Sequence, residues 1–95
     1  MISKGKQDMN NVEQVKRNTE ILRHAIIAEL EAINLYEQLA STTDDENVKK
    51  VLLDVAHEEK VHVGEFLTML LKFDKEQVVD LEAGRKEVEE LLGGL

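Results

Sequence analysis

Apolar residues recur at alternating steps of three and four along two long stretches of this chain. This spacing keeps side chains on one side of an α-helix, so it predicts two long helices, over residues 12–40 and 46–73. The connection between them is only about five residues long, which implies an antiparallel hairpin. The two seams consist of Val12, Val15, Thr19, Leu22, Ile26, Glu29, Ile33, Tyr36 and Ala40, and of Val48, Leu52, Val55, Glu59, His62, Phe66, Met69 and Phe73.

Capping patterns indicate where further helices begin. Thr43 and Glu46 match the Ser/Thr-x-x-Glu capping box, and Asp74 with Gln77 resembles a second one. A short third helix is therefore expected after Asp74, and glycines 93 and 94 should end it. One side of this helix would carry Val78, Leu81, Arg85, Val88 and Leu92.

The composition agrees with a single all-α domain. The 95 residues include no proline and no cysteine, so helices are not interrupted and no disulfide or thiolate metal site is available. The net charge of -8 argues against nucleic acid as a partner, and no apolar run is long enough to span a membrane. We expect a helical domain over residues 12–95 after a flexible polar segment over residues 1–11.

More apolar side chains are present than two helices and a short third can cover. Because a broad apolar surface on helices needs partner helices, the sequence predicts oligomerisation. The apolar residues outside the seams include Ile27, Leu30, Leu35, Leu53, Val63, Leu67 and Leu70.

Three polar residues interrupt the apolar seams: Glu29 in the first helix, and Glu59 and His62 in the second. An isolated buried carboxylate is costly unless it is paired, neutralised or bound to a metal. In an antiparallel hairpin the three residues lie at nearly the same level. Bundles that hold two metals use such a Glu-x-x-His pair twice, whereas this chain has one, so a second chain would supply the other half.

Carboxylates and one imidazole without sulfur suit Fe, Mn or Zn. A buried salt-bridge network that fixes helix register is the alternative interpretation of the same residues. Tyr36 shares the seam with Glu29, so its hydroxyl either hydrogen-bonds a ligand carboxylate or belongs to an ordinary core tyrosine. Glu31 and His24 share another face, which is either a weak cation site or a solvated surface.

Two segments resemble the encapsulated ferritins, a branch of the ferritin-like superfamily related to rubrerythrin. The segment 28–38 (AELEAINLYEQ) is similar to the first-helix motif of that family, and 54–62 (DVAHEEKVH) to its second-helix motif. The resemblance implies that two chains form a four-helix bundle with a di-iron centre between them. It assigns Glu29, Glu59 and His62 as iron ligands, Tyr36 as a neighbour of the centre, and Glu31 to a site through which iron arrives.

The resemblance further implies a ferroxidase that acts as a ring of dimers, typically a decamer, inside a cytoplasmic encapsulin shell used for iron storage. Ala28 and Leu35 stand where some members carry an acidic residue and a tryptophan. The chain shows no cargo-loading peptide before Leu95, which favours either a truncated cargo protein or the domain of a shell fusion. Two other functions remain open: a redox-silent module that binds Zn or Mn, and a plain helical oligomerisation domain.

Overall fold

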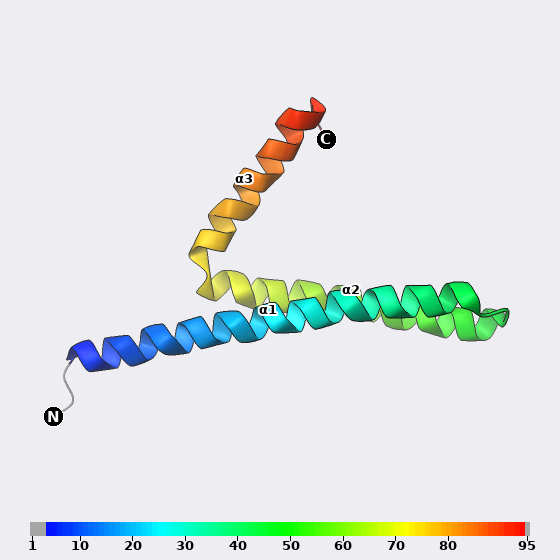
Figure 1. Cartoon of the computed structure of the whole chain (residues 1–95), viewed down its shortest axis with the longest axis horizontal. Helices are drawn as coiled ribbons and strands as arrows, with labels where there is room; N and C mark the ends of the chain where they lie inside the picture. Colours follow the sequence, from blue (N-terminus) through cyan, green and yellow to red (C-terminus); the bar gives the residue numbers. More distant parts are fainter. Residues whose placement is uncertain (1–3, 95) are drawn as a thin grey trace.

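Three α-helices form the fold of the chain, whose computed structural model describes residues 4–94. α1 spans Lys4–Thr42, α2 spans Glu46–Phe73 and α3 spans Lys75–Leu92. α1 and α2 pack as an antiparallel hairpin, and α3 leaves it at an angle (Figure 1). Residues 4–94 contain no β-strand, so the expected all-α fold is confirmed.

α1 begins at Lys4, well before the start expected at Val12. Residues 1–3 lie outside the described part of the chain, and the flexibility expected for residues 1–11 stays a prediction, whereas residues 4–11 continue the helix, so the start expected at Val12 is wrong. This expectation relied on the polar character of the segment. Extending an existing helix fixes only one further residue per hydrogen bond, and no proline stands in the way, so polarity alone does not end a helix.

The N-cap of α2 is Asp45 rather than Thr43, so the capping box expected at Thr43 is wrong. The Asp45 carboxylate accepts hydrogen bonds from the backbone N–H groups of Asn47 and Val48, each at 2.9 Å. Thr43 instead accepts a 3.1 Å bond from the Asp45 N–H through its hydroxyl. An aspartate that satisfies two N–H groups, near the positive end of the helix, is the better cap.

Replacing Asp45 by alanine should therefore lower the free energy of unfolding by about 1 kcal/mol, because two N–H groups lose their acceptor. Thr43→Ala should cost less than half as much, since Thr43 accepts only one bond in the exposed loop. Urea unfolding followed by circular dichroism measures both changes. A larger loss for Thr43→Ala than for Asp45→Ala would restore Thr43 as the cap.

The interior of the hairpin follows the expected seam on α1, whereas both buried residues of α2, Ala56 and Leu70, lie one position after the expected seam residues Val55 and Met69. Thr19, Ile33 and Ala40 are buried on α1. On α2 the expected seam residue Met69 is 43% exposed, while its neighbour Leu70 is only 4% exposed. A straight helix has 3.6 residues per turn, so a strict 3.5-residue pattern drifts around it and the buried position moves from Met69 to Leu70.

Asp74 forms the corner between α2 and α3. Its N–H donates to the Leu70 carbonyl at 2.9 Å, and its carboxylate accepts a 3.0 Å bond from the Gln77 N–H as the cap of α3. The same carboxylate accepts from Arg23 Nη2 of α1 at 2.8 Å. The expected cap at Asp74 is confirmed, and Gly93, with a φ of 73°, ends α3 as expected.

Large apolar side chains remain exposed on the hairpin. Ile27, Leu30, Leu35 and Leu53 are each about half exposed, whereas Val63 and Leu67 are half-buried and Leu70 is buried. The apolar surface expected outside the seams is therefore present on both helices. No helix in residues 4–94 is long and apolar enough to cross a membrane.

Candidate metal centre

The three polar seam residues meet in one cluster across the hairpin. Glu29 comes from α1, and Glu59 and His62 come from successive turns of α2. The spacing of three residues puts the latter two on the same side of α2, and the antiparallel pairing brings Glu29 to their level. One ligand atom from each residue lies within 4.8 Å of the others.

The distances in this cluster fit a shared cation better than direct pairing. His62 Nδ1 lies 3.6 Å from Glu29 Oε2 and 3.4 Å from Glu59 Oε2. Both separations exceed the usual N–H···O hydrogen-bond length of about 3 Å. Three atoms that converge without touching leave a position between them that an ion can coordinate.

Glu29 Oε2 is buried and has no hydrogen-bond partner in the described chain. A buried acceptor without a partner costs roughly 1–3 kcal/mol, and more when it is charged. Native proteins rarely leave such an atom unpaired, and a bound ion is one of the standard reasons for an exception. Carboxylate oxygens and an imidazole nitrogen are donors that Fe, Mn and Zn accept, so the residues present fit a transition metal.

The cluster is open on one flank of the hairpin. The His62 side chain is 42% exposed, whereas that of Glu29 is 18% exposed. The opposite flank carries an ion pair in which Lys60 Nζ donates to Glu37 Oε2 at 3.1 Å. A step of two residues along a helix corresponds to a rotation of about 200°. His62 comes two residues after Lys60, and Leu39 comes two residues after Glu37, so both lie on the side away from the ion pair. We call this side, with His62, Leu39, Val51 and Met69, the open flank.

The open flank carries apolar side chains before and after the histidine along α2. Val51 and Met69 share the direction of His62, because they lie eleven residues before and seven residues after it on α2. Val51, Met69 and Leu39 are all exposed in the described chain. An incomplete polar cluster, with exposed apolar side chains about 10 and 16 Å away along the same flank of α2, is an arrangement that a second helical hairpin would cover.

Two further residues predicted for the site lie outside the three-residue cluster. Tyr36 is half-buried on α1, two turns from Glu29, and no hydrogen bond joins its hydroxyl to a carboxylate within residues 4–94. Glu31 is exposed on α1. Their roles stay predictions. Lys60 lies inside the Glu59–His62 motif and pairs with Glu37 across the hairpin, a contact that no local sequence pattern predicts.

Comparisons with known proteins identify similar sequences. The family model described as Rubrerythrin matches residues 20–91. The chain is 66% identical to the Ferritin-like-encapsulin shell fusion protein of Pyrococcus furiosus over 74 residues, which are 78% of this chain and 21% of that protein. It is 41% identical to the encapsulin nanocompartment cargo protein EncC of Myxococcus xanthus over 56 residues, 59% of this chain and 43% of that protein.

A solved structure shares the fold. The crystal structure of the encapsulated ferritin domain from Pyrococcus furiosus superposes with a TM-score of 0.82 at 62% identity, covering 83% of this chain and 81% of that one. The chain matches about a fifth of the length of the first of these relatives and less than half of the length of the second.

Proposed function

Because the chain belongs to the rubrerythrin family of ferritin-like proteins, we propose that it is a ferroxidase that oxidises Fe(II) to Fe(III) at a di-iron centre shared by two copies. The buried, unpaired Glu29 Oε2, which faces His62 and Glu59, carries this proposal. A carboxylate oxygen in this position gains a partner when a cation binds.

Two copies are required because one chain supplies only three ligands. Two clusters that face one another across the open flank would provide four carboxylates and two imidazoles, the number of protein ligands used by di-metal carboxylate bundles. The exposed His62 and the apolar residues beside it support this pairing. The active site and the subunit interface would then be the same place.

Iron is the substrate of the proposed reaction. Two Fe(II) ions give one electron each, and the two electrons with two protons reduce dioxygen to hydrogen peroxide, or hydrogen peroxide to two water molecules, while both ions leave as Fe(III). The Glu29 and Glu59 carboxylates favour the product because negative oxygens stabilise the higher charge, most strongly where water is excluded. The net charge of -8 raises the local concentration of cations around the protein. In this scheme Tyr36 orients a ligand carboxylate, and Glu31 lies on the route by which iron arrives.

We place the protein in an encapsulin shell, with dimers assembled into a ring, such as a decamer, that releases Fe(III) for storage. The encapsulin relatives support this location, and the long exposed apolar surface supports an assembly larger than one hairpin pair. The same oxygen and nitrogen donors accept Zn or Mn, so a redox-silent metal-binding module is the competing function.

Anaerobic titration with Fe(II), followed by oxygen, tests the proposal. We expect two iron ions per dimer by native mass spectrometry, oxygen consumption, and a new ultraviolet absorbance of Fe(III). Zn(II) should compete for the same positions and suppress the absorbance. Binding of iron without oxygen or peroxide consumption would instead support the redox-silent module, and no metal binding at all would leave a helical oligomerisation domain.

A further inference from the structure

α3 is a helix without a packed face in the described chain. It has no buried residue, and from Asp74 it extends away from the hairpin (Figure 1). A helix of 18 residues is marginal in water on its own, because most helical stability in proteins comes from packing of an apolar face. A surface that covers α3 is therefore required.

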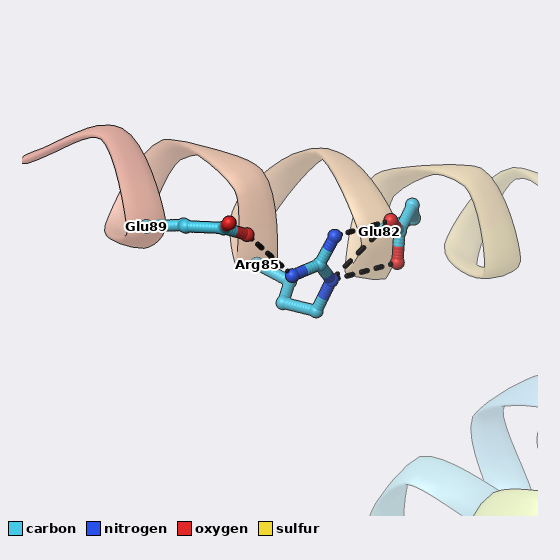
Figure 2. Close-up of polar contacts among 3 residues, drawn as sticks. All are labelled: Glu82, Arg85 and Glu89. Carbon is cyan, nitrogen blue, oxygen red and sulfur yellow. Dashed lines mark hydrogen bonds and ion pairs between the residues drawn. The ribbon is translucent and has the colours of Figure 1, made fainter. Parts of the chain in front are cut away.

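α3 offers an apolar stripe with a neutralised centre. Val78, Leu81, Val88 and Leu92 share one side and are exposed. Arg85 stands in the middle of the stripe, where Glu82 and Glu89 hold its guanidinium at 2.8 and 2.6 Å (Figure 2). These bonds raise the pKa of Arg85 and lower that of Glu82, so both groups stay ionised and paired. The stripe can thus pack against an apolar partner without burying an unpaired charge.

The N-terminal part of α1 offers a matching stripe. α1 extends beyond the corner where α2 ends (Figure 1). Thr19 is buried by the hairpin, but the next seam residues outward, Val15 and Val12, are exposed because α2 does not reach them. The two valines are three residues apart on one face, and Lys16 stands beside them.

The charge distribution distinguishes this surface from the rest of the chain. Residues 11–24 hold three basic and two acidic side chains, a net charge of +1, whereas residues 25–74 hold four basic and eleven acidic ones. α3, over residues 75–92, holds three basic and six acidic side chains. An acidic helix is repelled by the strongly acidic hairpin body and attracted by the single net-basic stretch.

The same chain does not bring these two stripes together. The Asp74 corner, with its bonds to Leu70, Gln77 and Arg23, holds the start of α3 in place, and among the residues that the structure describes α3 makes no contact with α1. We propose that α3 of one copy packs its apolar stripe on the Val12–Val15 face of α1 in a second copy, with Glu82 or Glu89 next to Lys16. This contact uses no residue of the metal cluster and is independent of the proposed ferroxidase function.

A matched pair of substitutions on α3 tests the contact. Val88→Asp charges the stripe, whereas Val79→Asp makes the same change on the side of α3 turned away from it. Sedimentation velocity, with a chelator present to remove any contribution from metal, measures self-association. We expect Val88→Asp to weaken self-association about tenfold or more, because Val88 is buried on docking. Val79→Asp should weaken self-association less than about twofold, because Val79 stays exposed. Equal effects would overturn the proposal, and circular dichroism checks that the hairpin stays folded in both.

Carbodiimide cross-linking of a mixture of light and ¹⁵N-labelled chains identifies the partner. We expect links from Lys16 to Glu82 or Glu89 that join a light chain to a heavy one, and Lys16→Arg, which removes the reactive amine but keeps the charge, should abolish them. Links confined to one isotope would mean that α3 folds back on its own chain, and their absence would mean that α3 docks elsewhere. Either result overturns the proposal, and neither bears on iron oxidation.

Discussion

Glu29→Ala is expected to remove most iron oxidation and, at the same time, to stabilise the metal-free chain. Loss of a ligand carboxylate should lower the rate of Fe(II) oxidation at least about 100-fold, since even residues behind the ligands commonly contribute 10–100-fold. The gain in stability follows from removing Oε2, which is buried without a partner. We expect the free energy of unfolding of the metal-free chain to rise by up to about 1 kcal/mol.

Stopped-flow absorbance measures the oxidation rate, and urea unfolding with chelator present measures the stability. Glu20→Ala, at an exposed position on the same helix, is the control and should change neither quantity appreciably. Added metal should stabilise the wild-type chain against unfolding, because a metal that binds only the folded chain favours the folded state. It should not stabilise the Glu29→Ala variant, which lacks the binding carboxylate. Oxidation at the wild-type rate would exclude Glu29 as a ligand.

A charge introduced on the open flank, far from the cluster, should also remove activity. Leu39 lies ten residues after Glu29, about 15 Å along α1, so it touches no metal ligand. Leu39→Asp should weaken dimerisation about 100-fold or more, because a buried apolar contact is replaced by a desolvated carboxylate. Iron oxidation should fall in parallel at concentrations where the wild-type chain is dimeric.

Leu30→Asp is the matched control for this experiment. Leu30 adjoins Glu29 in sequence and is about as exposed as Leu39, but it shares the flank of Glu37, seven residues further on. It should leave the oxidation rate per dimer within about twofold of wild type, the scatter usual for a surface substitution. If Leu30→Asp removes activity and Leu39→Asp does not, the two copies meet through the opposite flank and the assignment of the interface is wrong.

Local patterns were sufficient to predict most of the hairpin and the convergence of its three polar seam residues. α2 runs from Glu46 to Phe73 as the sequence predicted, and Glu29, Glu59 and His62 converge as their levels in the two seams indicated. Both results follow from helical periodicity, which acts between neighbouring turns. The shift from Met69 to Leu70 has the same origin, since small departures from a 3.5-residue repeat accumulate along a helix.

The features that were missed depend on competition or on long-range contacts. Thr43 and Asp45 are both good N-cap residues, and the sequence pattern does not say which side chain reaches the free N–H groups. The bracing pair of Lys60 and Glu37 joins residues 23 positions apart. The direction of α3 depends on Arg23 and Asp74, which are 51 positions apart and belong to no shared motif.

A cluster that is open on one flank has a consequence in kinetics. Where half of the ligands reside on each chain, an isolated chain is catalytically silent, and at low concentration the rate of oxidation grows with the square of the chain concentration. Newly synthesised chains would then handle no iron until they find one another. Assembly itself would act as the switch that turns the chemistry on, without a separate regulator.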